Sequence, residues 1–197
     1  MNQRLSDQVA HAEQRDECVK NLLLENIEYK TEKTRWGVWR RFLYPTGAHF
    51  AEFKSHSRML GLPLVHYARG INPETGKRIA AKGIIAVGRL AVGVLAIGHV
   101  SAGVIAIGQL GVGLIVGLGQ LSTGAYALGQ AAVAAVIGVG QVATGQVAIG
   151  QIGIGEYVLA QIGIGEHVWS PDRADPEAVE FFKRLWADVL AWWQAQG

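Results

Sequence analysis

Side chains that could do chemistry are few, and they do not form a catalytic pattern. The single cysteine, Cys18, lies in a charged segment with no His or Asp placed to activate its thiol. Glu156 and Glu166 occupy equivalent positions ten residues apart, which on a twenty-residue coil are opposite sides, too far apart for paired acid–base work. The histidines lack the spacing of a metal site; they are His11, His49, His56, His66, His99 and His167.

The glycine-rich segments do not complete a nucleotide-binding motif. Residues 138–143 match a loose G-x-G-x-x-A pattern, but an array with glycine at every fifth position produces such matches by chance. The segment from Gly70 to Lys77 is one residue too long for a phosphate-binding loop, and Arg78 stands where that motif has Ser or Thr. We therefore predict a protein that is not an enzyme, with no catalytic, cofactor-binding or metal-binding residues and no cofactor.

Charge is distributed unevenly along the 197 residues. Residues 1–89 hold 15 basic and 9 acidic side chains, a net charge of +6, whereas residues 90–155 hold none of either kind. Residues 156–197 hold 3 basic and 7 acidic side chains, a net charge of −4. The overall charge of +2 does not favour a nucleic-acid partner, and the 50% hydrophobic content excludes a disordered chain.

The cysteine count and the first residues bear on the compartment. One cysteine excludes a disulfide scaffold, and the first 30 residues are too charged for a secretory signal. We expect a cytoplasmic protein that could also associate with a membrane.

The uncharged segment is a five-residue repeat. Glycine recurs every five residues from Gly83 to Gly113 and, with two one-residue insertions, continues to Gly165, with Ala160 replacing it once. The unit is Gly, any residue, a branched aliphatic residue, a small residue and usually a second aliphatic residue. One example is Gly145-Gln146-Val147-Ala148-Ile149. A fixed period of this kind determines the fold of the segment.

The repeat predicts a mainly β chain built around a β-solenoid, flanked by N-terminal and C-terminal α-helices. Each unit would form one short strand and a glycine corner, with the central aliphatic residue inward and the small residue outward. The insertions before Gly119 and Gly140 lie 21 residues apart, which favours a four-sided coil of about 20 residues. The predicted inward residues are Leu90, Leu95, Val100, Ile105, Leu110, Leu121, Val142, Val147, Ile152 and Ile162.

Two alternatives stay open for this segment. One is a two-sided coil of ten residues, because the residue after glycine alternates between a polar and an apolar type. The other is a set of transmembrane helices, because 66 uncharged residues are enough for two or three spans. The five-residue period argues against helices, since it would distribute glycine over every helical face, and so do glutamines such as Gln109 and Gln120.

The array resembles the pentapeptide-repeat family, whose fold is a four-sided right-handed β-helix. Glycine takes that family's small position and the aliphatic residue its central position, but Gln, Val or Glu replaces the usual Asp or Asn. The acidic exterior of the DNA-mimicking members is missing, so their activity is not implied. The chain is also similar to uncharacterised bacterial proteins with Gly-x-x-Ala-Ile-Gly arrays. In those proteins, segments like Phe53-Lys54-Ser55 and Gly61-Leu62-Pro63-Leu64-Val65-His66 precede the array; the resemblance covers roughly residues 50–168 and implies no activity.

Both flanks carry their own patterns. An apolar stripe predicts a helix over residues 2–33, followed by an aromatic, basic linker at residues 34–44. Asp175-Pro176-Glu177 predicts the start of a C-terminal capping helix. The expected regions are 1–49 (helix and linker), 50–82 (first cap), 83–168 (solenoid) and 169–197 (C-terminal helix). The linker could plug the core, or contact an anionic membrane surface through Trp36, Trp39, Arg40 and Arg41.

Aliphatic residues expected to point outward predict an interface. Contiguous apolar surface on this scale is typical of association. We predict a self-assembling scaffold that associates through apolar faces or oppositely charged ends. The alternatives are a membrane-associated protein and a soluble protein-binding platform. The candidate interface residues are Val92, Ile97, Ile107, Val112, Leu128, Ile149 and Ile154 in the array, and Phe182, Trp186 and Trp193 in the C-terminal helix.

Overall fold

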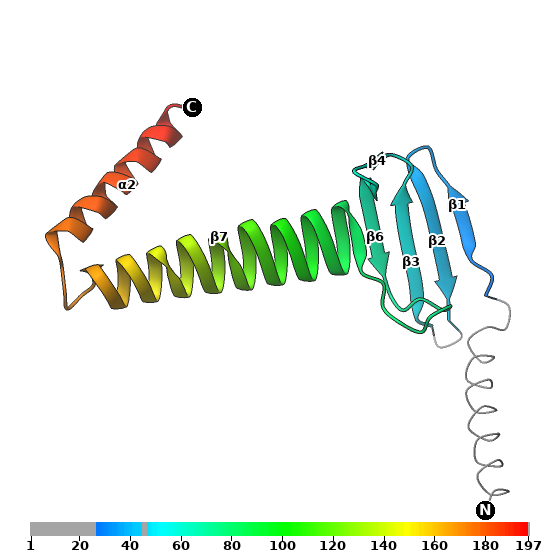
Figure 1. The fold of residues 1–197 in the computed structure, drawn as a ribbon, viewed down its shortest axis with the longest axis horizontal. Coiled ribbons are helices and arrows are strands. Elements are labelled where there is room, and N and C mark those ends of the chain that lie inside the picture. Colours follow the sequence, from blue (N-terminus) through cyan, green and yellow to red (C-terminus); the bar gives the residue numbers. More distant parts are fainter. Residues whose placement is uncertain (1–26, 45–46, 197) are drawn as a thin grey trace, which may run out of the picture.

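The computed structural model describes residues 27–44 and 47–196 (Figure 1). A small sheet at one end leads into a long coiled strand, and a helix follows at the other end. The strands are β1 (Lys30–Lys33), β2 (Gly37–Leu43), β3 (His49–Ser55), β4 (Arg58–Met59), β5 (Leu62–Pro63), β6 (Val65–Arg69) and β7 (Ala81–Trp169), and the helix is α2 (Pro176–Gln194).

The N-terminal strands form a mixed sheet that continues into the coil. Its strand order is β1-β2-β3-β6-β7, and β4 pairs with β5 in a separate two-stranded sheet. Neighbours from β1 to β6 are antiparallel, whereas β6 runs parallel to β7, with Val65 opposite Ile85 and Ala68 opposite Gly88. The sheet therefore extends the stack of β7 turns along the axis of the coil (Figure 1).

β7 is a continuous strand of 89 residues that winds around a long axis (Figure 1). Residues ten positions apart lie in adjacent turns. A Cβ built on Gly93 would collide with the carbonyl oxygen of Gly83, and one on Gly155 would collide with that of Gly145. One turn therefore takes ten residues, or eleven where an insertion falls, as between Gly108 and Gly119.

The predicted four-sided solenoid of twenty-residue coils is wrong. The contacts between adjacent turns join residues ten or eleven apart, not twenty. The ten-residue spacing is that of the two-sided alternative, but the described sheets are one mixed five-stranded sheet and one two-stranded sheet, with no closed solenoid among them. Transmembrane helices are excluded for the array itself, because residues 81–169 are strand throughout.

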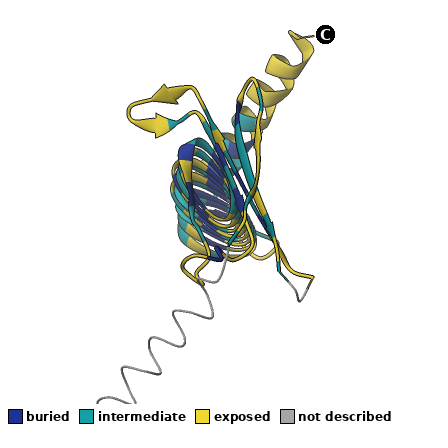
Figure 2. Cartoon of the chain, turned by 90° about the vertical axis from the view of Figure 1, so that its right-hand side faces the viewer, coloured by how far each residue is buried: buried dark blue, intermediate teal, exposed yellow. Residues whose placement is uncertain are grey.

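The inside of the coil is lined by small residues, which reverses the predicted orientation. Buried side chains recur at every fifth position, beginning with Ala81, Ala86, Ala91, Ala96 and Ser101, all at most 1% exposed. The central aliphatic residues point outward instead, and in Figure 2 the buried residues follow the inner side of the turns. A ring of ten residues is too narrow for Leu or Ile, so Ala, Ser and Gly fill it, with valine only in the last turns, at Val158 and Val168.

Glycine recurs because adjacent turns approach closely, not because the corners need a left-handed backbone. Among the described residues, positive φ angles at glycine occur only outside β7, at Gly47, Gly61, Gly70 and Gly76. Within β7 most glycines of the five-residue period face the backbone carbonyl of the preceding turn, where a side chain would not fit, whereas Gly153 and Gly163 face valine side chains. The period of five thus reflects two close backbone approaches in each ten-residue turn.

The two flanks depart from prediction in different ways. The predicted helix at residues 2–33 is wrong at its C-terminal end, because Lys30–Lys33 forms β1; residues 1–26 lie outside the described part. The predicted linker at residues 34–44 contains β2. The C-terminal helix is present and begins at Pro176, with Asp175 at the N-cap and Glu177 in its first turn.

Candidate functional site

The most extensive surface feature of β7 is an apolar face, called here the open face. Because the backbone alternates, the residues on either side of each buried small residue both point outward. Two rows result, and their large aliphatic members are exposed by 37–61%. One row holds Leu90, Val100, Leu121, Val142, Ile152 and Ile162, and the other holds Val92, Val112, Val133, Ile154 and Ile164.

No ionisable side chain interrupts the two rows of the open face between Leu90 and Ile164. The remaining members of the rows are small, apolar or hydroxyl-bearing, such as Ala131 and Thr144. A row that begins with Arg89 and His99 and continues with amides borders the face at one corner of the coil, where it lines a shallow groove with its apolar neighbours. The glutamines of this groove are Gln109, Gln120, Gln130 and Gln141.

Half a turn away lies a second apolar face, which α2 covers near the C-terminal end. Ile149 packs with Leu159 and Val147 against the first part of the helix. Phe182, only 5% exposed, and Ala178 fill this contact from the helix side. We call this surface the helix-side face; β6 pairs with its first turn, so the N-terminal sheet continues it along the axis.

The structure divides the predicted interface between these two faces. Val92, Val112 and Ile154 lie on the open face. The helix-side face carries Ile97, Ile107, Leu128 and Ile149. Phe182 belongs to internal packing, which corrects its assignment to an exposed interface.

Sequence reasoning missed one row of the open face. Leu90, Val100, Leu121, Val142, Ile152 and Ile162 were expected inside the coil, whereas they are exposed. The indication that could have found them is the strict small-residue pattern at the next position: Ala91, Ser101, Ser122 and Ala143 suit only a narrow interior.

The distal half of α2 exposes large aromatic residues. Trp186 is 66% exposed, Trp192 60% and Trp193 74%, whereas Phe182 near the start of the helix is buried. The helix leaves the end of the coil and diverges from it toward its own C-terminus (Figure 1). Only the first half of α2 therefore stabilises its attachment to β7.

The aromatic and basic residues of the predicted membrane contact do not form one patch. Trp36 is 74% exposed, but Trp39 packs on Phe53 with its ring centroid 5.0 Å away. Arg41 lies over the Trp39 ring at 4.9 Å, while Arg40 points to the other side of β2 and pairs with Glu52. The alternation of β2 thus separates the two arginines.

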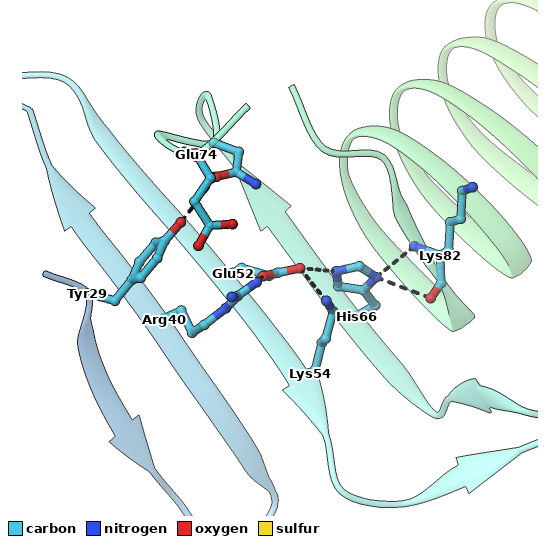
Figure 3. Close-up of polar contacts among 8 residues, drawn as sticks. Tyr29, Arg40, Glu52, Lys54, His66, Glu74 and Lys82 are labelled. Carbon is cyan, nitrogen blue, oxygen red and sulfur yellow. Dashed lines mark hydrogen bonds and ion pairs between the residues drawn. The ribbon is translucent and has the colours of Figure 1, made fainter. Parts of the chain in front are cut away.

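The most buried charge in the described chain belongs to Glu52 on β3 (Figure 3). Its carboxylate is 1% exposed and forms an ion pair with Arg40 of β2, the residue directly opposite in the antiparallel register. Lys54 Nζ approaches Oε1 at 2.8 Å, and His66 Nε2 of β6 approaches the same oxygen at 3.1 Å. Three adjacent strands therefore meet at one carboxylate.

His66 connects this cluster to the first turn of β7. The backbone N–H of Lys82 donates to Nδ1 at 2.8 Å, and the Lys82 carbonyl oxygen lies 3.1 Å from the same nitrogen; with Nδ1 assigned as the acceptor of the shorter bond, Nε2 carries the hydrogen. Nε2 then donates to Glu52 Oε1, as the chain of contacts in Figure 3 shows. The arrangement fixes the sheet to the coil through side chains as well as through the β6–β7 ladder.

Electrostatics support an ionised Glu52. Burial disfavours the charged form, but hydrogen bonds from His66, Lys54 and Arg40 outweigh it and hold the pKa of the carboxyl well below its usual range. The hydrogen bond to Glu52 in turn raises the pKa of Arg40. The cluster is enclosed by its own partners, so its geometry serves to hold β2, β3, β6 and β7 together.

Tyr29 lies beside this cluster and contacts the turn before β7. Its hydroxyl donates to Asn72 Oδ1 at 3.1 Å, and Asn72 also accepts the backbone N–H of Glu74 at 2.9 Å. Burial, with a contribution from the Glu74 carboxylate, raises the pKa of Tyr29 to about 12. The phenol therefore acts as a hydrogen-bond donor that braces the turn.

No family model, curated protein or solved structure matches this chain. The resemblance to pentapeptide repeats and to Gly-x-x-Ala-Ile-Gly arrays accordingly stays a prediction. Within residues 27–44 and 47–196, no helix has both the length and the apolar character needed to cross a membrane.

Proposed function

We propose that this chain is a non-enzymatic structural protein that self-associates through the open face of β7. One observation carries the proposal: two adjacent rows of mostly aliphatic side chains, the larger of them exposed, run from Leu90 to Ile164 with Thr123 and Thr144 as their polar members and without an ionisable residue. Isolated exposed aliphatic residues need no explanation, but a contiguous apolar surface is typical of an interface.

The dimensions of the open face correspond to a small, weak interface, because two copies would bury about 680 Å² between them, below the roughly 1,000 Å² of a stable complex. Leu90 and Ile162 are seven turns apart, which at about 4.8 Å between strands gives a length of about 34 Å. A width of about 10 Å for three residues makes a surface of roughly 340 Å² before side-chain relief is counted. Two flat β faces of this kind pack against each other as the sheets of a sandwich do.

Charge favours an antiparallel arrangement of the two copies. Lys82 and Arg89 lie in the first turn of β7, whereas Glu156 and Glu166 lie in the last two. Antiparallel copies place the basic end of one beside the acidic end of the other, while parallel copies bring like charges together. These charges are exposed, so added salt should weaken the preference without abolishing apolar packing.

Light scattering of the purified full chain tests self-association. We expect a molar mass above that of the 21.1 kDa monomer, and a shift to the monomer in Val133→Lys, which places a charge in the middle of the open face. Leu114→Lys is the matched control, because Leu114 is 74% exposed on a corner of the coil outside that face. A monomeric wild type, or equal effects of the two lysines, would contradict the proposal.

Cysteine cross-linking tests the orientation in a Cys18→Ser background. In antiparallel copies Val92→Cys of one chain approaches Ile164→Cys of the other, so mixing the two variants should yield disulfide dimers. Ile164→Cys alone should remain uncross-linked, since identical ends lie at opposite sides of the assembly. Efficient cross-linking of Ile164→Cys with itself would overturn the antiparallel arrangement.

A further inference from the structure

A groove lies on the helix-side face, where the N-terminal sheet meets the first turns of β7. Its volume is about 1470 Å³. Residues from the ends of β3 and β6, and from the turn that leads to β7, form one wall. The floor is a row contributed by four successive turns, consisting of Val87, Ile97, Ile107 and Leu118. We call it the basic groove because arginines line the end next to the N-terminal sheet, which we call its head.

The head of the basic groove is lined by cations and by no carboxylate. Arg69, Arg78 and Arg89 line it together with His49 and His99. All three arginines are exposed. Among the described residues, no carboxylate lies within ion-pair distance of any of the three. Their positive potential is therefore not neutralised locally and is available to an anion.

The arginines lie only at the head of the basic groove, and the apolar floor continues beyond them along β7. The row that begins with Arg89 proceeds through His99 to Gln109, so no further cation follows along the coil. The floor spans three turn-to-turn steps, about 14 Å at the usual spacing between strands. β7 is strand throughout, so its backbone groups are engaged between turns and offer little to a peptide backbone.

We propose that the basic groove binds one anionic lipid, with its phosphate at the three arginines and an acyl chain along the apolar floor. Guanidinium groups match phosphate oxygens through paired hydrogen bonds, and a methylene chain matches a row of Val, Ile and Leu. A nucleic acid would need repeated cations or stacking aromatic residues along the floor, and a peptide would need a free strand edge. Tyr44 and Tyr67 line the groove only at its head, and the floor itself has no aromatic residue, no repeated cations and no free strand edge.

This inference is independent of self-association. The floor of the basic groove lies on the helix-side face, half a turn of β7 away from the open face, whereas Arg89 and His99 stand at the corner of the coil that borders the open face. A second copy on the open face would leave the apolar floor, Arg69 and Arg78 accessible. Lipid binding and assembly can therefore fail separately.

Calorimetric titration of the full chain with palmitoyl lysophosphatidylglycerol, below its micelle concentration, tests the proposal. We expect one equivalent to bind, with affinity that falls as salt is raised. Palmitoyl lysophosphatidylcholine has the same chain and no net charge, and should bind about tenfold more weakly. Inorganic phosphate alone should bind more weakly still. Equal affinity for the two lipids, or phosphate binding as tight as lipid binding, would overturn the assignment.

Variants locate the lipid in the groove. Arg78→Gln and Arg89→Gln should each weaken binding about threefold, as expected for exposed charge pairs, and together about tenfold. Arg58→Gln, an exposed arginine on β4 outside the groove, should leave affinity unchanged. Equal losses in the Arg58 and Arg78 variants would place the lipid elsewhere.

A second pair of variants tests the acyl chain. Ile107→Asp places a charge in the floor and should remove detectable binding, whereas Val112→Asp on the open face should retain it. The arginine variants keep the proposal testable if Ile107→Asp does not fold, which circular dichroism would reveal. Unchanged lipid affinity in a folded Ile107→Asp would overturn the placement of the chain.

Discussion

Val158 fills the space that a side chain on Gly153 would need. A Cβ built on Gly153 would lie 2.6 Å from Val158 Cγ1, inside the contact limit of carbon atoms. Val158 is completely buried, in a position that Ala or Gly holds in the earlier turns. The last turns therefore replace two facing small residues, such as Ala91 and Ala96, by one glycine and one valine.

This relationship predicts a compensating pair of substitutions. Gly153→Ala should destabilise the chain by about 2 kcal/mol through overpacking, and Val158→Ala by about 2 kcal/mol through a cavity. The double variant should recover at least about 1 kcal/mol of the summed loss, because it restores facing alanines. Guanidinium unfolding of the four proteins measures the coupling.

Gly155→Ala serves as the control for that cycle. A Cβ on Gly155 would meet the backbone carbonyl of Gly145, which no side-chain change relieves. Adding Val158→Ala to Gly155→Ala should therefore give summed losses. Equal rescue in both cycles would mean that the coil expands as a whole rather than at one contact.

A buried hydroxyl in the coil should reduce stability. Ser122 is 0% exposed, and its Oγ has no hydrogen-bond partner among the described residues. Ser122→Ala should stabilise the chain by about 1 kcal/mol, because it removes an unsatisfied polar group. Ser101→Ala should gain less, since Ser101 Oγ donates to the Leu110 carbonyl at 3.4 Å. A denaturation midpoint that falls in Ser122→Ala would show that its hydroxyl is bonded.

Loss of the Glu52 charge should weaken the link between sheet and coil. Glu52→Gln leaves Arg40 and Lys54 without their carboxylate and should cost about 3 kcal/mol at neutral pH. Glu32→Gln is the matched control, since Glu32 is exposed and 3.5 Å from Arg41; it should cost less than about 1 kcal/mol. Thermal unfolding at pH 7 distinguishes the two variants.

The Glu52 carboxyl should make the free energy of unfolding depend on pH. Its pKa is lowered in the folded chain from the ordinary value of 4.5, so its contribution is present above that value and is lost as pH falls below it. Glu52→Gln should flatten the stability profile between about pH 5 and pH 3 relative to the wild type. Parallel profiles for the two proteins would contradict an ionised Glu52 in the folded state.

Asp175 should hold the start of α2 to the last turn of the coil. Its Oδ2 accepts the backbone N–H of Val168 at 2.8 Å and lies 2.9 Å from Arg173. Asp175→Ala should speed amide exchange at Val168 and in the first turn of the helix, while exchange in the first turns of β7 stays unchanged. Uniform acceleration along the chain would instead indicate loss of global stability.

The sequence by itself determined the period, the extent and the uncharged character of the array. It also determined the helix start at Pro176, because an Asp, a Pro and an acidic residue form a local signal that needs no tertiary partner. The candidate self-association through exposed aliphatic residues follows from composition and stays a prediction. Val92, Val112 and Ile154 lie on the proposed face as expected from their place in the repeat.

Only the tertiary structure decided which side of the strand is inside. Alternation places Leu90 and Ala91 on opposite sides of the backbone, but alternation alone does not say which one faces inward. The circumference decides: ten residues enclose a space that admits Ala91 and excludes Leu90. The pairing of Arg40 with Glu52 likewise depends on the β2–β3 register, which joins residues twelve positions apart.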